Sequence, residues 1–178
     1  MGIYMIVMIN GAFGVGKSST SSQLVNHLPN AMLYDPEEIG LMLRKIIPDA
    51  MKHEDEKTED FQDLELWRML VVQVAEQMVN KYKCSLVVPM TLKNKVYFDY
   101  IYEGLQSIDE NTYCFCLTAS IECIHNRLEE RGNKPGSWAH IRTLDCLNAY
   151  SSDYFGEYVD TEHISIQDTV ENILCQVM

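Results

Sequence analysis

Apolar runs and amphipathic stretches alternate along most of the chain. Residues 3–9 are continuously apolar and partly β-branched, which is typical of a strand covered on both faces in a parallel sheet. The segment 64–78 instead places apolar residues at 64, 67, 71, 74 and 78, the spacing of a helix that buries one face. This alternation predicts a doubly wound α/β fold with about five strands.

The bounds of the expected elements follow the pattern and its breaks. Pro29 and Pro48 end helices, and Pro36 suits the first position of another helix, where its missing amide proton costs no hydrogen bond. The acidic segment 49–60 is expected to be a mobile loop, and glycines interrupt the pattern at 132–136. Strands are expected at 3–9, 31–34, 86–89, 112–117 and 163–166, and helices at 17–28, 36–47, 64–78, 94–107, 120–131, 139–150 and up to about 177.

Length and composition narrow the class of protein. The 178 residues, 47% hydrophobic and 22% charged, suit one globular domain and exclude a disordered or fibrous chain. A net charge of −12 disfavours binding of extended nucleic acid and favours a small ligand at a focused site. The six cysteines form no CxxC pair, so we expect reduced thiols and no zinc site. The first apolar run lacks a basic leader and is too short to span a bilayer, so a cytoplasmic protein is expected.

The most specific motif is a glycine-rich loop between the first strand and the first helix. Residues 11–18 read Gly-Ala-Phe-Gly-Val-Gly-Lys-Ser and match G-x-x-x-x-G-K-[ST], in which backbone amides and a helix N-terminus hold phosphates. Lys17 is expected to reach the terminal phosphates, and the Ser18 hydroxyl is expected to ligate Mg²⁺. Residues 133–136 lack the final Asp of a guanine-reading Asn-Lys-x-Asp motif, which favours ATP over GTP. The expected nucleotide-binding residues are Gly11, Phe13, Gly14, Val15, Gly16, Lys17, Ser18 and Ser19.

Three charged residues are candidates for the transfer chemistry. Arg127 and Arg131 lie four residues apart on one expected helix face, where they can close over phosphates as a lid; the alternative is a solvated flank paired with neighbouring glutamates. Asp35 ends the second expected strand, at the sheet edge that faces the ligand in such folds. It is the candidate for orienting an acceptor hydroxyl and for holding Mg²⁺ together with Ser18. A helix-capping role explains Asp35 equally and would make it a poorer base.

The acceptor side is marked by weaker signals. Arg44 and Arg68 are candidates for pairing with acceptor groups, and Arg142 is a weaker candidate for the lid. Phe61 and Trp67 either wall an acceptor pocket or belong to the core. The third expected strand ends without the Asp that many nucleotide hydrolases use to hold the waters of the metal, and Thr91 is the nearest hydroxyl substitute.

Short motifs shared with one protein family are spread over nearly the whole chain. They occupy residues 10–18, 34–40, 43–44, 60–62, 66–68, 88–91, 133–134, 137–138 and 164–168. In this combination the chain resembles the ATP-binding tunicamycin-resistance proteins, which are related to shikimate, adenylate and chloramphenicol kinases. The resemblance implies a three-layer P-loop fold with a five-stranded parallel sheet in the order 2-3-1-4-5 and an arginine lid. It places the working positions at Lys17, Ser18, Asp35, Arg127 and Arg131.

The resemblance also assigns regions to the chain. Residues 1–178 are expected to form a single P-loop kinase-like domain, with a lid region at about 127–142 and an acceptor-binding region at about 36–70. Adenine is expected near the lid-helix arginines and near Asp160 and Thr161. The sequence stops at Met178, without the longer basic or amphipathic tail of some family members, which argues against membrane attachment. The oligomeric state stays open, with a homodimer as one option.

Two functions remain at this stage. The first is an ATP- and Mg²⁺-dependent phosphotransferase acting on a hydroxyl of an antibiotic or nucleoside-like compound, of the tunicamycin-resistance type. The second is an ATP-binding protein that sequesters tunicamycin or a similar drug without phosphoryl transfer. The expected partners are ATP and a small-molecule acceptor, and no nucleic acid.

Overall fold

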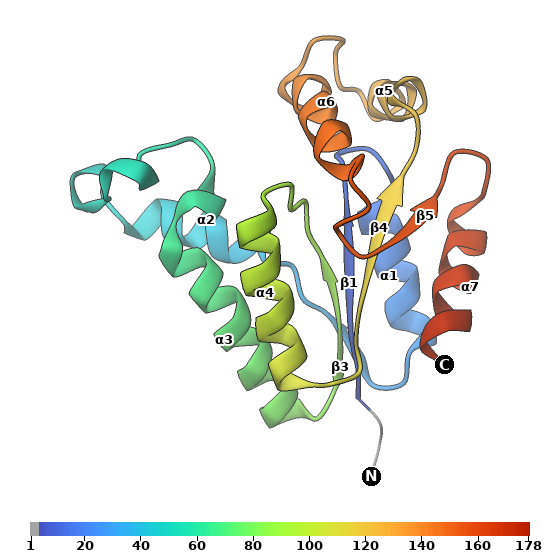
Figure 1. Ribbon diagram of the computed structural model, residues 1–178, viewed down its shortest axis with the longest axis horizontal. Helices are drawn as coiled ribbons and strands as arrows, with labels where there is room; N and C mark the ends of the chain where they lie inside the picture. The colour runs from blue at the N-terminus through green and yellow to red at the C-terminus, as the bar shows by residue number, and fades with distance from the viewer. Residues whose placement is uncertain (1–3) are drawn as a thin grey trace.

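A computed structural model describes residues 4–178 and shows five parallel strands with helices around them (Figure 1). The strands run in the order β2-β3-β1-β4-β5, which confirms the α/β fold and the sheet order expected from the sequence. The strands are β1 (Ile6–Gly11), β2 (Ala31–Leu33), β3 (Ser85–Pro89), β4 (Thr112–Thr118) and β5 (Glu157–Asp160). The helices are α1 (Lys17–His27), α2 (Glu37–Ile46), α3 (Glu65–Tyr82), α4 (Lys95–Ile108), α5 (Ile121–Glu130), α6 (Trp138–Tyr150) and α7 (Ile166–Val177).

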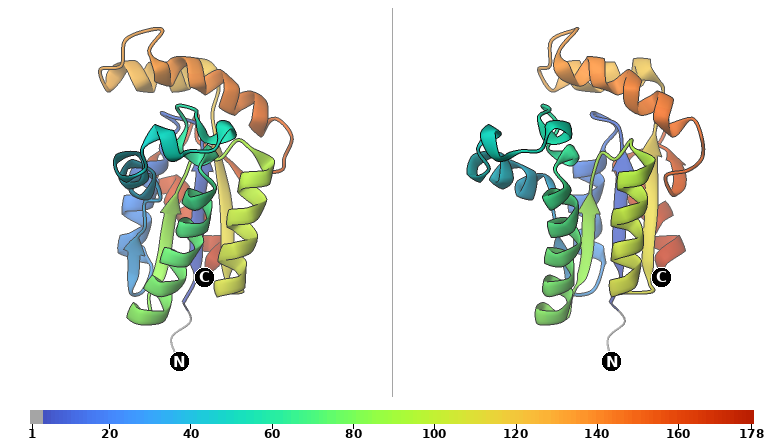
Figure 2. Two further views of the ribbon diagram at one scale, coloured as in Figure 1. Left: turned by 90° about the vertical axis from the view of Figure 1, so that its left-hand side faces the viewer. Right: turned by 60° about the vertical axis from the view of Figure 1, so that its left-hand side comes forward.

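The central strand explains why an unbroken apolar run opens the sequence. Every residue of β1 is buried, because β3 and β4 pair with it on its two sides and helices cover both faces. The helices α1 and α7 pack together on one face, and α3 and α4 pack together on the other (Figures 1 and 2). A strand without a solvent-facing side has no need for alternating polar residues, so it reads as a continuous apolar segment.

The carboxyl ends of the strands carry two separate groups of elements. The helices α5 and α6 cross above this edge of the sheet, and α2 lies at the same edge together with the segment 47–63 (Figure 2). In an open parallel sheet this edge is where loops converge on a ligand. Within residues 4–178, no helix combines the length and the apolar character that crossing a bilayer requires.

The last strand is the one element that the sequence pattern placed wrongly. A strand was expected at 163–166, but β5 lies at Glu157–Asp160, where it pairs with β4. Ser165 is instead the N-cap of α7, and its side chain and that of Asp168 form a reciprocal capping box. The alternation of Ile164, Ser165 and Ile166 therefore marks a helix start, where the capping bonds outweigh local β propensity.

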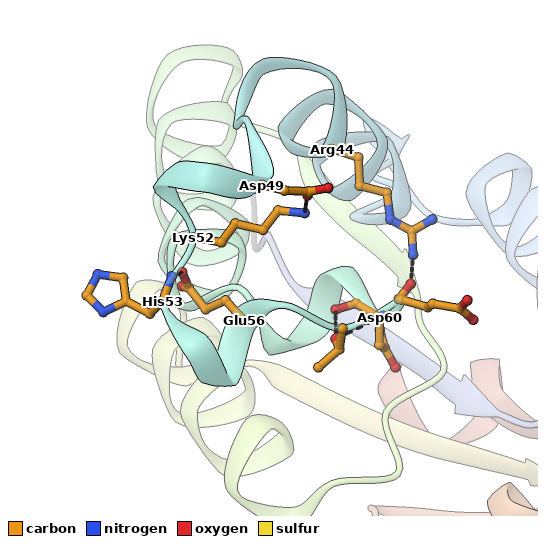
Figure 3. Close-up of polar contacts among 8 residues, drawn as sticks. Arg44, Asp49, Lys52, His53, Glu56 and Asp60 are labelled. Atoms are coloured by element: carbon orange, nitrogen blue, oxygen red, sulfur yellow. Dashed lines mark hydrogen bonds and ion pairs between the residues drawn. The ribbon is translucent and has the colours of Figure 1, made fainter.

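The acidic segment 49–60 contains short helical turns. Two 3₁₀ turns, Asp49–Met51 and Glu54–Glu56, interrupt it, and a third, Phe61–Asp63, leads into α3. The first two turns are held by local contacts between Lys52 and Asp49 and between His53 and Glu56 (Figure 3). The segment thus forms a shaped wall at the carboxyl edge of the sheet.

Candidate active site

The glycine-rich loop joins β1 to α1 at the carboxyl edge of the sheet. Gly14 and Gly16 have φ angles of 81° and 114°, in the region that strongly favours glycine. A Cβ at Gly14 would also lie 2.8 Å from Cγ of Leu128 on α5. Ser18 and Ser19 expose their side chains on the first turn of α1, which carries no acidic residue. The loop therefore offers backbone amides, hydroxyls and a positive helix end to an anion.

Lys17 is the first residue of α1, at the end of this loop. Its ammonium donates a hydrogen bond to the carbonyl oxygen of Ala12 at 2.8 Å. Loss of hydration on burial lowers the pKa of Lys17 to about 8, and the charge of Arg131 acts in the same direction. Because burial disfavours the ammonium form, an anion placed beside it gains an electrostatic partner that water does not screen well. The loop residues thus fit the phosphates of a nucleoside triphosphate.

Asp35 stands between β2 and α2 and is exposed. One oxygen of its carboxylate accepts a hydrogen bond from the backbone amide of Glu37 at 3.0 Å. The N-cap position, which the sequence left as an alternative role for Asp35, is instead occupied by Pro36. With Ser18, Asp35 supplies one hydroxyl and one carboxylate. This small oxygen donor set fits Mg²⁺, which usually keeps waters and shares its remaining positions with substrate phosphates.

A cavity of about 260 Å³ opens beside the loop. Three predicted acceptor residues, Arg44, Phe61 and Thr91, line it, together with Phe13 of the loop. Five segments distant in sequence contribute to its wall. The other lining residues are Glu37, Leu41, Glu59, Asp60, Gln62, Lys93, Trp138, Arg142 and Cys146.

Glu37 is one of the cavity residues that sequence reasoning missed. Partial burial raises the pKa of its carboxyl, and the nearby charge of Asp35 raises it further, whereas Lys17 acts in the opposite direction. Glu37 thus combines access to the cavity with electrostatic contact to the phosphate lysine. The sequence Asp35-Pro36-Glu37 places two carboxylates close together, which could have marked Glu37 as a candidate site residue. The pattern of a helix start also explains both carboxylates, so Glu37 did not stand out.

Trp67 and Arg68 lie outside the cavity. Trp67 is only 1% exposed, packs 5.4 Å from Phe61 between ring centroids, and donates a hydrogen bond from its indole to the carbonyl of Pro36 at 2.9 Å. Arg68 donates to the carbonyl of Gln62 at 2.7 Å and lies 4.2 Å from the ring centroid of Tyr97. Both side chains contact residues of the cavity wall, Trp67 through Phe61 and Arg68 through Gln62, without lining the cavity themselves.

Arg44 ties the helix α2 to the segment 47–63. Its guanidinium hydrogen-bonds the carbonyl oxygen of Glu59 (Figure 3) and lies 5.2 Å from the ring centroid of Phe61. Below it, Gly40 of α2 approaches the Phe61 ring so closely that a Cβ at position 40 would overlap the ring. The cavity wall therefore depends on close contact between α2 and the turn Phe61–Asp63.

The two arginines that the sequence predicts for a lid have different surroundings. The guanidinium of Arg127 makes hydrogen bonds within the protein. It donates to the carbonyl of Val15 at 3.2 Å and to the hydroxyl and carbonyl of Thr161 at 3.0 and 2.6 Å. Arg131 is exposed, yet its charge lies near enough to Lys17 to lower the pKa of that lysine. The helix α6 also reaches the loop, because the rings of Trp138 and Phe13 meet edge-on with centroids 4.9 Å apart.

Comparison with solved structures places this arrangement among known folds. No protein-family model and no curated protein matches the chain. Its structure matches the tunicamycin resistance protein of Deinococcus radiodurans with a TM-score of 0.79 and 27% identity, over 98% of this chain and 95% of the other. The chain is similar to a tunicamycin-resistance protein. This similarity confirms the resemblance that its sequence motifs predicted.

More distant neighbours extend the fold assignment to P-loop kinases. A gluconokinase from Sinorhizobium meliloti 1021 matches with a TM-score of 0.67 at 16% identity, over 99% of this chain and 93% of the other. A shikimate kinase from Bacteroides thetaiotaomicron matches with a TM-score of 0.62 at 13% identity, over 97% and 98%. At these identities the matches establish the fold alone, and that fold is kinase-like.

Proposed function

We propose that this protein is an ATP-dependent small-molecule kinase, which transfers the γ-phosphate of ATP to a hydroxyl of an antibiotic or nucleoside-like compound. The observation that carries the proposal is the position of the cavity. The cavity is lined by Phe13 of the phosphate loop and by Glu37. The positive charge of Lys17 acts to lower the pKa of the Glu37 carboxyl. A carboxylate beside a phosphate lysine, at the wall of a cavity, suits attack by an acceptor hydroxyl.

The residues take the following roles in this proposal. The amides of residues 11–18 and the ammonium of Lys17 hold the triphosphate, and Arg131 neutralises charge at the γ-phosphate. The acceptor oxygen bonds to the γ-phosphorus, its proton passes to the Glu37 carboxylate, and the bond from the γ-phosphorus to the bridging oxygen breaks to release ADP. Ser18 and Asp35 would hold Mg²⁺, and that ion would supply neutralisation of phosphate charge.

Arg127 acts as a positioning residue. Its bonds to Val15 and Thr161 connect the phosphate loop to the segment after β5, where we place the adenine near Asp160 and Thr161. We propose further that residues 1–178 act as one domain, in which residues 127–142 form the lid and residues 36–70 form the acceptor-binding region. We place the reaction in the cytoplasm.

A second candidate is ATP-dependent sequestration of tunicamycin or a similar drug without transfer. Two observations favour it: the Asp35 carboxylate is engaged by the amide of Glu37, and β3 ends at Pro89 with no Asp in the residues that follow directly. In this case both ligands stay intact, and each changes the affinity of the other by the same factor.

Product analysis separates the two candidates. The protein is incubated with MgATP and a panel of hydroxylated compounds that includes tunicamycin, and products are examined by mass spectrometry beside Lys17→Met as the inactive control. A phosphorylated product that is missing with Lys17→Met supports the kinase. Reciprocal tightening of drug and nucleotide with no product supports sequestration, and failure of the wild-type protein to bind MgATP contradicts both.

A further inference from the structure

The acceptor cavity, the hollow of about 260 Å³ that the proposed function assigns to the acceptor, carries balanced charges. Three carboxylates and three cations line it, namely Glu37, Glu59, Asp60, Arg44, Lys93 and Arg142. An adjoining hollow of about 240 Å³ shares Glu59, Asp60, Lys93 and Arg142 and adds the carboxylate of Asp63. Neither hollow therefore offers an excess of positive charge to a phosphate or carboxylate of the acceptor.

The three cations of the cavity already have partners within the protein. The guanidinium of Arg44 hydrogen-bonds the carbonyl oxygen of Glu59. One carboxylate oxygen of Asp145 lies 3.5 Å from Nζ of Lys93 and 3.3 Å from the guanidinium of Arg142. A charged ligand would lose hydration in the cavity without finding a free counter-charge, which costs free energy. The balance of charges thus favours a ligand that carries none.

Large apolar side chains are left exposed at the same wall. Leu41 of α2 is 43% exposed and Trp138 of α6 is 57% exposed, and both line the cavity. The rings of Phe13 and Phe61 line it too. Aliphatic and aromatic side chains that meet at a cavity from separate elements offer a surface on which a flat or apolar group is removed from water. The cavity therefore suits a ligand with one apolar part.

The charged part of the wall is fixed by buried polar contacts. Lys93 lies in the β3–α4 loop next to Leu92, whose amide and carbonyl are both bonded by the buried side chain of Asn10 on β1. The side-chain amide of Gln62, which lines both hollows, donates to the carbonyl of Thr91 at 2.9 Å and ties the turn before α3 to the same loop. The two segments that carry the opposite charges are therefore held together before any ligand binds.

Hydroxyl groups are the ligand groups that such a wall can bind without a change of charge. A hydroxyl both donates and accepts, so several hydroxyls on one ring can bond to carboxylates and cations alike. An apolar group beside them would cover the exposed side chains of Leu41 and Trp138. The two parts of the wall together match one kind of molecule.

We propose that the acceptor is an uncharged glycoside, a polyhydroxylated ring that bears a flat or apolar group. The apolar group packs against Leu41 and Trp138, and one hydroxyl of the ring lies toward Glu37. Glu59 and Lys93 determine specificity, because each cancels one opposite charge in the wall. This inference rests on the proposed kinase function, because that function places the acceptor in the cavity.

The test compares glycosides that differ from one another in a single feature. Protein saturated with Mg²⁺ and the non-hydrolysable analogue AMP-PNP is titrated by calorimetry with phenyl glucoside, phenyl glucuronide, phenyl glucosaminide and methyl glucoside. The glucuronide adds a negative charge, the glucosaminide adds a positive charge at mildly acidic pH, and the methyl glucoside lacks the flat ring. We expect phenyl glucoside to bind about tenfold or more tightly than either charged analogue. It should bind about three- to tenfold more tightly than methyl glucoside.

Two variants should shift the preference in opposite directions. Glu59→Gln leaves one cation unbalanced and should raise the affinity for phenyl glucuronide relative to phenyl glucoside by about tenfold. Lys93→Gln leaves one carboxylate unbalanced and should do the same for phenyl glucosaminide. Lys95→Gln is the matched control, because Lys95 lines neither hollow and lies 4.4 Å from the ring centroid of Tyr154. Thermal melts of the three variants verify folding.

A second pair of variants tests the apolar part of the wall. Trp138→Leu should weaken the binding of phenyl glucoside by about three- to tenfold and leave that of methyl glucoside almost unchanged. Tyr100→Leu is the matched control, because it removes an exposed ring of α4 that lines neither hollow. It should change the binding of neither glycoside.

Several results would overturn the inference. They are tightest binding of a charged glycoside by the wild-type protein, no saturable binding of any of the four glycosides, and the same shift in Lys95→Gln as in Lys93→Gln. Equal losses of phenyl and methyl glucoside in Trp138→Leu would overturn the role of that ring. In each case a protein that binds AMP-PNP leaves the proposed kinase function standing. If the wild-type protein fails to bind AMP-PNP, the proposed function fails, and this inference fails with it.

Discussion

The phosphate loop and the acceptor cavity are built in opposite ways. The loop is one continuous stretch between a buried strand and a helix, and its chemistry depends on neighbours in sequence. The cavity is assembled from α2, the turn Phe61–Asp63 and the residues before it, the β3–α4 loop and α6. A contiguous motif keeps its geometry when the rest of the chain changes, whereas an assembled wall changes with every element. We therefore expect changes in the cavity wall to alter acceptor binding more than nucleotide binding.

The largest effect is expected at Lys17. Lys17→Met should abolish nucleotide binding, a loss of more than about 100-fold in affinity, because the only ammonium in the loop is removed. The same change should stabilise the ligand-free protein by about 1–2 kcal/mol, since it removes a charge that burial disfavours. Calorimetric titration with MgATP and a thermal melt of the ligand-free protein measure the two effects. A variant that keeps wild-type affinity would contradict the role of the loop.

The next effect separates the two neighbouring carboxylates. If Glu37 accepts the proton of the acceptor, Glu37→Gln should lower kcat by about 100-fold or more with little change in the KM for ATP. Asp35→Asn should mainly raise the requirement for Mg²⁺, because Asp35 bonds the Glu37 amide and does not line the cavity. Steady-state kinetics across Mg²⁺ concentrations distinguish the two variants. Equal losses of kcat would mean that the carboxylates act as one unit.

The affinity for ATP should depend on pH through Lys17 of the loop and not through the residues of the cavity. The pKa of Lys17 in the ligand-free protein is about 8, and a bound phosphate favours the ammonium. Affinity for ATP should therefore fall as pH rises above about 8, approaching tenfold per pH unit, and binding should take up a proton there. Without ligand, the folded protein binds fewer protons than the unfolded chain above this pH, so stability should rise with pH toward the ordinary lysine pKa.

Calorimetry in buffers of different ionisation enthalpy measures this proton uptake. The Lys17→Met variant provides no control for binding, but its stability should lose the rise with pH between about 8 and 10. Affinity for ATP that is constant from neutral pH to above pH 9 would show that the lysine remains charged throughout.

The smallest effect on nucleotide chemistry is expected from a change in the cavity wall. Gly40→Ala should lower the free energy of unfolding by about 1–3 kcal/mol, because the added Cβ would overlap the Phe61 ring. The affinity for MgATP should be almost unchanged, while acceptor binding weakens. In a Phe61→Leu background the same substitution should cost less, because the ring is no longer present. A double-mutant cycle from chemical denaturation measures this coupling.

Much of the fold could be predicted because its signals are local. Fully buried strands give apolar runs, prolines end helices, and the phosphate loop has fixed spacing. The strand β5 was missed because Glu157–Asp160 is short and mostly polar, while the capped start of α7 imitates an alternating strand.

The wall of the cavity could be predicted only in part. Arg44, Phe61 and Thr91 line the cavity, and their acceptor role stays a prediction. Helical spacing cannot tell that Trp67 faces Pro36 and the core. The hydrogen-bond partners of Arg127, Val15 and Thr161, lie more than 30 positions away in the sequence, so local spacing does not predict them. The approach of Glu37 to Lys17 likewise depends on the packing of β2 against β3, a tertiary relation that spacing does not record.

The buried amide of Asn10 has a consequence for protein engineering. Its side chain holds both polar backbone groups of Leu92 and accepts a bond from the hydroxyl of Tyr150 at 3.2 Å, so one residue at the end of the central strand aligns two of the segments around the ligand. Transplanting the β3–α4 loop from a protein of the same fold would preserve its alignment only if the graft presents the same pair of backbone groups to that amide. To exchange substrate preference between related proteins, the grafted loop must therefore keep its hydrogen bonds to Asn10 as well as supply the residues that contact the substrate.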